Sequence, residues 1–131
     1  METKTVPSAD QWLREAKADA AAADCGMFLL HNGVVRRSAK ARVRSGDESA
    51  PDVRGMCFSW DREKTAAAIA EAEQMDGIKI VRVWMNEGEL SVGDDIMYVL
   101  VGGDIRPHVV DALQALVGKL KNECVTELER S

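Results

Sequence analysis

Residues Glu87–Lys121, EGELSVGDDIMYVLVGGDIRPHVVDALQALVGKLK, decide the fold of this chain. Within them, Ile96–Val101 is a short apolar run rich in β-branched and aromatic residues, which predicts an inner strand. The strand ends at Gly102–Asp104, where the aspartate is placed to cap a following helix. Pro107 fits the start of that helix because amides of the first turn have no partner within it. The stretch therefore predicts a turn, a strand, a glycine-rich corner and a helix.

The helix predicted after Asp104 has a single buried face. Its apolar residues recur at steps of three and four, as they do along the side of a helix that packs on a core. They are Val109, Leu113, Leu116, Val117, Leu120 and Cys124. Lys121 follows Val117 by four residues, so it lies at the border of this face rather than on the solvated side.

Upstream of this stretch the sequence predicts further helices and strands. Their boundaries follow from apolar periodicity and from glycine, proline and polar turn residues. They are helices at 8–24 and 61–75, ended by Gly26 and Gly77, and strands at 27–35, 53–60 and 78–85. Asn32–Gly33 is expected to form a bulge or a tight bend within the first of these strands.

The fold class follows from the order of these elements. The segment between strands 78–85 and 96–101 is too short for a crossover helix, so the two strands are expected to pair antiparallel. The order predicts an α+β fold, with helices packed on a largely antiparallel sheet. The chain, residues 1–131, is expected to form one domain, with loose segments at 1–7 and 125–131.

Composition argues against several function classes. The 131 residues carry a formal net charge of −5, which disfavours non-specific nucleic-acid binding by bulk charge. We recognise neither an apolar run long enough to span a bilayer nor a secretory signal, so we expect an intracellular protein without membrane association. Cys25, Cys57 and Cys124 are odd in number and widely spaced, which predicts reduced thiols in the cytoplasm.

Residues 36–44 carry five cations and no acid, although the protein as a whole is acidic. The cations are Arg36, Arg37, Lys40, Arg42 and Arg44. Two interpretations are open: a solvated loop or edge ribbon, and a local anion-binding patch. The polar stretch 45–52 that follows predicts a turn-rich connection.

The corner Gly102–Arg106 is a second candidate anion site. Free amides at a helix start, glycines that let a ligand approach the backbone, and a nearby arginine would together bind an anion. An ordinary strand-to-helix turn with Arg106 on the surface explains the same residues equally well. Lys121 is likewise either a solvated helix lysine or, beside apolar surface and other cations, a nucleophile or proton shuttle.

Motifs of several common enzyme classes are absent from the sequence. We find no Walker loop, dinucleotide-binding fingerprint or nucleophile elbow. His31 and His108 lack metal-ligand spacing, and the cysteines form no CxxC or Cys/His cluster. Structural roles are therefore expected for these residues, and no metal site is expected.

Two blocks of the sequence form a family pattern when they are taken together. The first is GMFLLHNGVVR, residues 26–36, an apolar strand that ends in G-x-V-R. The second is residues 80–121, in which V-x-x-x-x-G-x-L-x-x-G-D, an apolar strand, an arginine and a helix ending x-x-L-K follow without a gap. In order and spacing these blocks resemble the large, catalytic subunit family of molybdopterin synthase. The resemblance covers most of the chain, from about Cys25 to Lys121.

The resemblance implies a fold, a reaction and partners. The fold would be an α/β hammerhead with a small added β subdomain. The protein would form a homodimer at the centre of a heterotetramer, with a small ubiquitin-like sulfur-carrier subunit that bears a C-terminal Gly-Gly thiocarboxylate. The implied reaction of molybdenum cofactor biosynthesis transfers sulfur from that thiocarboxylate to cyclic pyranopterin monophosphate. The sulfurtransferase would need no metal or other cofactor for this step.

The resemblance also implies site residues. Arg36 and Arg106 match arginines of the family and would bind anionic groups, with Gly103 and Arg37 beside them. Lys121 matches the lysine at the end of the family's helix. It would attack or polarise the thiocarboxylate carbonyl, or shuttle a proton.

Three positions depart from the family pattern. Ile105 stands where the family commonly has a histidine, and His31 stands where it has an aromatic residue. Leu128 falls where an ungapped continuation would place a second lysine, which leaves Lys119 or Arg130 as candidates to compensate. The alternative function is therefore a weakly active or inactive paralogue that binds a pterin or a sulfur carrier as a dimeric module.

Overall fold

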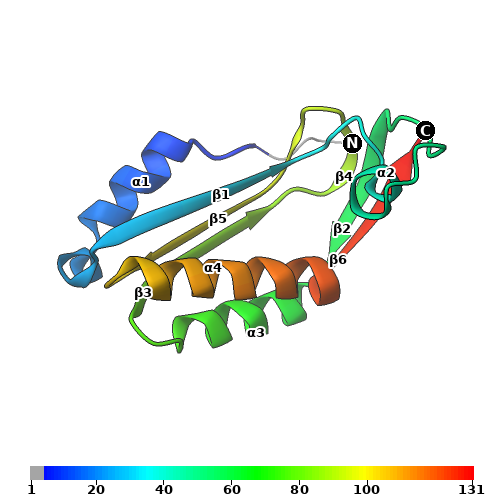
Figure 1. Ribbon diagram of the computed structural model, residues 1–131. Coiled ribbons are helices and arrows are strands. Elements are labelled where there is room, and N and C mark those ends of the chain that lie inside the picture. Colours follow the sequence, from blue (N-terminus) through cyan, green and yellow to red (C-terminus); the bar gives the residue numbers. More distant parts are fainter. Residues whose placement is uncertain (1–4) are drawn as a thin grey trace.

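The computed structural model describes residues 5–131, and residues 1–4 of the segment predicted to be loose lie outside the described residues. Helices and strands follow one another along the whole described chain (Figure 1). In order they are α1 (Ala9–Ala18), η1 (Ala20–Asp24), β1 (Met27–Val34), α2 (Lys40–Ser45), β2 (Gly55–Trp60), α3 (Arg62–Glu73), β3 (Ile78–Met85), β4 (Gly88–Ser91), β5 (Asp95–Gly103), α4 (Arg106–Lys119), η2 (Leu120–Cys124) and β6 (Val125–Arg130).

The larger sheet has the strand order β1-β5-β3, and both of its strand pairings are antiparallel. Val99 of β5 lies opposite His31 of β1 on one side and Val83 of β3 on the other. The predicted pairing of 78–85 with 96–101 is therefore confirmed. The register shifts between Gly33 and Val34, so the bulge predicted as one option at Asn32–Gly33 is confirmed.

Helices cover both faces of this sheet, with α1 on one face and α3 and α4 on the other (Figure 1). Side chains of β5 alternate between the two layers, as the pleat of a strand requires. Val99 and Val101 belong to the main core with α3 and α4, whereas Leu100 packs with Trp12 of α1. All three β5 residues are fully buried, which explains the continuous apolar run in the sequence.

Short polar signals set the helix boundaries. Ser8 accepts a hydrogen bond from the Gln11 amide at 3.2 Å, and Asp61 accepts one from the Lys64 amide at 2.9 Å. The helix predicted over 8–24 is interrupted at Asp19, which ends α1 and caps the 3₁₀ turn η1. The prediction that Asp104 is the N-cap of α4 is wrong by one residue, as described below with the site.

A second sheet has the order β4-β2-β6 and stands at the end of the molecule where α4 ends (Figure 1). The prediction that 125–131 is loose is wrong, because Val125–Arg130 pairs along the whole of β2. The turn-rich segment after Glu87 likewise contains the short strand β4. The sequence pattern reveals neither strand, since β4 is only four residues long and the inward position in the middle of β6 is the carboxylate Glu127.

The predicted α+β class is confirmed: helices pack on antiparallel sheets. The small β subdomain corresponds to the second sheet. The hammerhead arrangement that the resemblance implies stays a prediction.

Candidate functional site

The chain leaves α4 through a single wide turn that places Lys121. η2 is a π-helical turn in which Leu120 and Cys124 are buried. Such turns widen the helix and are frequent at functional sites. Lys121 lies between the two buried anchors, and its side chain is 29% exposed. Its predicted position at the border of the buried face is confirmed.

Lys121 faces a pocket between the end of α4, the bend after β1, helix α2 and the second sheet. Val34, Met56 and Ile96 form its apolar part. Of the described residues, four cations and two carboxylates also line it: Arg36, Lys40, Arg44, Lys121, Glu127 and Glu129. The formal charge of the lining is +2. An acidic protein thus concentrates positive charge in one concave place, which is the arrangement that attracts an anion.

Strand β6 supplies the carboxylates of this pocket. The Glu127 side chain is only 5% exposed, and its oxygens lie 3.4 Å from Nζ of Lys40 and 3.9 Å from Nζ of Lys121. The Glu129 carboxylate accepts a hydrogen bond from the Lys40 amide at 3.1 Å. Sequence reasoning missed both glutamates because it treated their segment as loose. Their alternation on one face of β6 becomes informative only once the strand is known.

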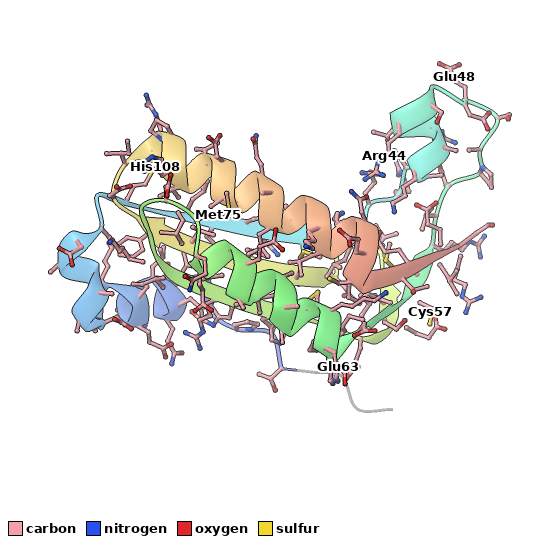
Figure 2. The ribbon with its side chains drawn as sticks, turned by 90° about the horizontal axis from the view of Figure 1, so that it is seen from below. Arg44, Glu48, Cys57, Glu63, Met75 and His108 are labelled. Carbon is pink, nitrogen blue, oxygen red and sulfur yellow. The ribbon has the colours of Figure 1, made fainter. Side chains whose placement is uncertain are left out.

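The cation-rich segment 36–44 is neither a simple solvated loop nor an extended ribbon, because it contains helix α2. Arg36 bends back and donates from Nε to the Ser38 carbonyl at 2.8 Å. Arg42 faces away from the pocket and pairs with Asp52 at 2.8 Å and with the Ala50 carbonyl. Figure 2 shows Arg44 on the side of α2 that is near the end of α4. Three of the five cations, Arg36, Lys40 and Arg44, line one pocket, and anion binding by this patch stays a prediction.

His31 lies within electrostatic reach of Lys121. Burial, and after it the positive charge of Lys121, lowers the pKa of the His31 imidazole below its ordinary value. Its Nε2 atom is buried without a hydrogen-bond partner in the described part of the chain. A neutral imidazole therefore stands beside Lys121 near neutral pH.

Replacing Lys121 by alanine is expected to raise the pKa of His31, because the charge of Lys121 is one of the two causes of its depression. An NMR titration of the His31 ring protons measures this. Lys119→Ala is the matched control, since Lys119 pairs with Glu71 at 2.6 Å instead. A His31 pKa that is the same in Lys121→Ala as in the wild type would contradict this geometry.

The same shift makes stability depend on pH. Because the folded pKa of His31 lies below the unfolded value of about 6.5, the unfolded chain binds more protons between the two values. His31 therefore contributes stability that is fully present above about pH 6.5 and is lost as the pH falls through the folded pKa. The melting temperature of His31→Gln should fall less than that of the wild type over this window. If the melting temperatures of the two proteins fell equally with pH over this window, the proposed contribution of His31 would be contradicted.

Arg106, Gly103 and Arg37 do not line the pocket. Arg106 begins α4, and the fifteen positions from it to Lys121 span about 20 Å at the helical rise. Figure 2 accordingly shows His108, two residues after Arg106, at the opposite end of α4 from Arg44. Arg37 is exposed and offers its carbonyl to the Val53 amide at 2.7 Å. The ligand-binding roles of these residues stay predictions.

The Gly102–Arg106 corner is packed rather than open. An added Cβ at Gly103 would lie 2.7 Å from the Gly77 carbonyl oxygen and 2.9 Å from the Val109 side chain. Ile105 takes the N-cap position without a side-chain cap, and Asp104 instead accepts from the Ile105 amide at 2.7 Å and pairs with His108 at 2.8 Å. The hydrogen bond from His108 is the main cause that lowers the pKa of Asp104. The Asp104 carboxylate is thus already engaged within the corner.

Gly103→Ala is expected to lower the free energy of unfolding by about 1–3 kcal/mol, because the added methyl group overpacks a fully buried position. Urea denaturation measures the change. Gly118→Ala is the control on α4, where nothing lies within 4 Å of the added Cβ. That change should instead stabilise the protein by about 0.5–1 kcal/mol. Equal stability of Gly103→Ala and the wild type would show that the corner is loosely packed.

The two residues considered as substitutes for a second lysine lie elsewhere. Lys119 pairs with Glu71 of α3, and Arg130 pairs with Glu89 of β4 at 3.3 Å. Leu128 is 53% exposed, and it points to the opposite face of β6 from Glu127 because the two residues are adjacent in the strand. Lys40 is the lysine that reaches the pocket beside Lys121.

Other chemistry is sparse across residues 5–131. No group of three or more His, Cys, Asp or Glu side chains could hold a metal ion there, and the helices there are too short or too polar to cross a bilayer. Cys25, Cys57 and Cys124 are free thiols, as predicted. Burial raises the pKa of Cys25 and Cys124, which does not favour a reactive thiolate.

Solved structures share this fold. Molybdopterin synthase from Staphylococcus aureus is 16% identical with a TM-score of 0.72, and the alignment covers 95% of this chain and 85% of the other. The MoaE protein from Burkholderia ambifaria is 18% identical with a TM-score of 0.72, and the alignment covers 97% of this chain and 83% of the other. A complex of subunits 1 and 2 of the molybdopterin-converting factor from Helicobacter pylori is 13% identical with a TM-score of 0.66, and the alignment covers 94% of this chain and 78% of the other. At these identities the likeness establishes the fold.

Family membership rests on the sequence itself. No curated protein matches the chain. The sequence profile of the family described as MoaE protein, however, matches residues 6–123, which is most of the chain and includes both blocks of the predicted resemblance. The chain therefore belongs to the MoaE protein family.

Proposed function

We propose that the protein is the large subunit of molybdopterin synthase and transfers sulfur during molybdenum cofactor biosynthesis. The observation that carries the proposal is the pocket in which Arg36, Arg44 and Lys121 meet, in a chain of the MoaE family. The substrates would be cyclic pyranopterin monophosphate and the thiocarboxylate of a small partner subunit. No cofactor beyond these substrates is invoked, and this stays a prediction.

The lining of the pocket suits two anionic substrates. A cyclic phosphate diester and a thiocarboxylate are both anions, and the planar guanidinium groups of Arg36 and Arg44 can bind such groups through two parallel hydrogen bonds. The apolar side chains of Val34, Met56 and Ile96 offer a surface for a flat heterocycle. The chemical types of the lining residues therefore match both parts of a phosphorylated pterin.

Lys121 is the residue we assign to the reaction. In each transfer the carbon–sulfur bond of the thiocarboxylate breaks and a carbon–sulfur bond to the pterin side chain forms in place of a carbon–oxygen bond. Water supplies the oxygen of the carboxylate that is left, and the oxygen displaced from the pterin side chain leaves as water or stays on the phosphate. An amine or ammonium group at the carbonyl can polarise it, attack it or move the proton released by water. Lys121 is accessible, fixed at the end of a helix and next to the arginines.

The partners follow from the same proposal. The complex of two converting-factor subunits among the related structures supports a small-subunit partner for this chain. Its Gly-Gly tail would enter the pocket beside Lys121. A homodimer within a heterotetramer remains part of the proposal, and Arg106 would serve a pocket only if a second copy of the chain supplied it. Free cysteines agree with a cytoplasmic protein.

One observation favours the alternative of a binding module without turnover. Leu128 and Ile105 are exposed apolar residues at positions where the resemblance leads one to expect a lysine and a histidine. Such a module would bind the Gly-Gly-tailed partner or the pterin phosphate and form no product. Calorimetry with each ligand and with Arg36→Ala would test it.

Reconstitution decides between the two functions. The purified protein is mixed with a thiocarboxylated small subunit and cyclic pyranopterin monophosphate, and the dithiolene product is measured. We expect product formation that depends on all three components. Binding of both ligands without product, while an authentic large subunit gives product under the same conditions, would leave the binding module as the function.

A further inference from the structure

Glu127 is a carboxylate in an unusually buried place. Its side chain is 5% exposed, and burying a carboxylate costs several kcal/mol unless other charges or hydrogen bonds compensate. The apolar backing comes from Phe58, which lies directly opposite Glu127 across the β2–β6 pairing and is fully buried. Paired residues of antiparallel strands share a face, so the ring covers the carboxylate on the core side.

The compensation for this burial is incomplete and is shared between two lysines. Nζ of Lys40 lies 3.4 Å from Oε2, and Nζ of Lys121 lies 3.9 Å from Oε1. Both distances exceed the range of about 2.7–3.2 Å that hydrogen bonds to nitrogen favour. Within the described residues, Oε1 is buried and has no hydrogen-bond partner at all. The carboxylate therefore attracts both ammonium groups without locking either of them.

The two lysines come from distant parts of the chain and meet at this carboxylate. Lys40 starts α2 and its amide is held by Glu129, whereas Lys121 lies in the turn after α4. Their side chains are 36% and 29% exposed, so both remain accessible from the pocket. Long lysine side chains otherwise spread over many rotamers, and one shared partner narrows this spread.

We propose that Glu127 is a positioning residue that directs Lys121 and Lys40 into the pocket, and that Lys40 is thereby the second lysine of the sulfur-transfer site. The inference rests on the proposed function. Glu127 touches no substrate in this role; it acts through the two ammonium groups. Lys40 adds a second positive charge where the thiocarboxylate and the phosphate would bind.

Kinetics of the reconstituted reaction test the proposal. Glu127→Gln keeps the size of the side chain and removes its charge. We expect it to lower kcat at least tenfold while the KM for the pterin changes less than threefold. Lys40→Ala should lower kcat similarly and Lys40→Arg should restore most of it. The double variant Lys40→Ala/Glu127→Gln should lose no more than the worse single variant, because the two groups act as a unit.

Glu71→Gln is the matched control for these variants. It removes a carboxylate from a lysine pair at the same end of α4, at Lys119, outside the pocket. Its kcat should equal that of the wild type. A kcat of Glu127→Gln within twofold of the wild type would overturn the proposal. If Glu127→Gln does not fold, as judged by its melting curve, Lys40→Ala and Lys40→Arg decide in the same way.

Competitive acetylation provides a readout that does not need the reaction. Lysines are labelled with limiting acetic anhydride and quantified by mass spectrometry. Loss of the shared carboxylate should increase labelling of Lys40 and Lys121 at least twofold in Glu127→Gln, with Lys119 as the internal reference. Unchanged labelling would overturn the positioning role. If the wild type forms no product, the proposed function fails while this measurement still decides the role of Glu127.

Discussion

Lys121→Ala is expected to lower the rate of product formation by about 10²–10⁴-fold, the range for loss of a positioned general acid or base. Lys121 is the partly exposed lysine between the buried anchors Leu120 and Cys124, and it lines the pocket together with Arg36 and Arg44. The measurement is single-turnover formation of the dithiolene from a thiocarboxylated small subunit. The loss should appear in the rate constant at saturating substrates rather than in binding of the partner.

Lys119→Ala is the control for this variant. Lys119 lies two residues away but pairs with Glu71 on the α3 side, so its removal should leave the rate within about twofold of the wild type. If Lys121→Ala and Lys119→Ala gave the same rate as the wild type, the pocket would not be the site of sulfur transfer.

Phe58→Ala is expected to lower the free energy of unfolding by about 3–5 kcal/mol, the usual cost of removing a buried aromatic ring. Phe58 is the central inward side chain of the second sheet, lies opposite Gly88 of β4 and Glu127 of β6, and is fully buried. Urea denaturation followed by circular dichroism measures the change. The midpoint should fall without a large change in slope, because the fold itself is kept.

Val43→Ala is the control for stability, since Val43 is 55% exposed on α2. Exposed positions of this kind usually change stability by less than about 0.5 kcal/mol. A Phe58→Ala protein as stable as Val43→Ala would mean that the second sheet contributes little to the cooperative core.

The strand–corner–helix stretch could be predicted because periodicity and packing agree there. The side chains of β5 are apolar on both faces, and α4 has one apolar stripe. Strand β6 could not be predicted in this way, because its inward position is Glu127. That carboxylate is tolerated only because Lys40 and Lys121, 87 and six residues before it, reach the same place. Hydrophobic pattern contains no information about such an ion cluster.

The sequence predicted individual residues of the candidate site, but it did not show which of them lie together in the folded chain. Arg36 and Lys121 were predicted from the resemblance, and the structure brings them to one pocket. Arg106 was predicted on the same helix as Lys121, but the length of α4 separates the two within one chain. Lys40 was visible only as one of five cations in a local patch. Its partner in β6 distinguishes it, and that partner is defined by tertiary structure alone.

The clamp at Arg42 has a consequence for the affinity of the pocket. By pairing with Asp52 and the Ala50 carbonyl, Arg42 closes the segment 42–52, which carries Arg44. The hydrogen bond from the Val53 amide to the Arg37 carbonyl closes the wider loop that carries Lys40 and Arg44. The conformational entropy of ordering this loop is then lost when the chain folds rather than when an anion arrives. Preorganisation of this kind favours tight binding with little rearrangement. An arginine that never touches the ligand thus helps to set how strongly the other cations hold it.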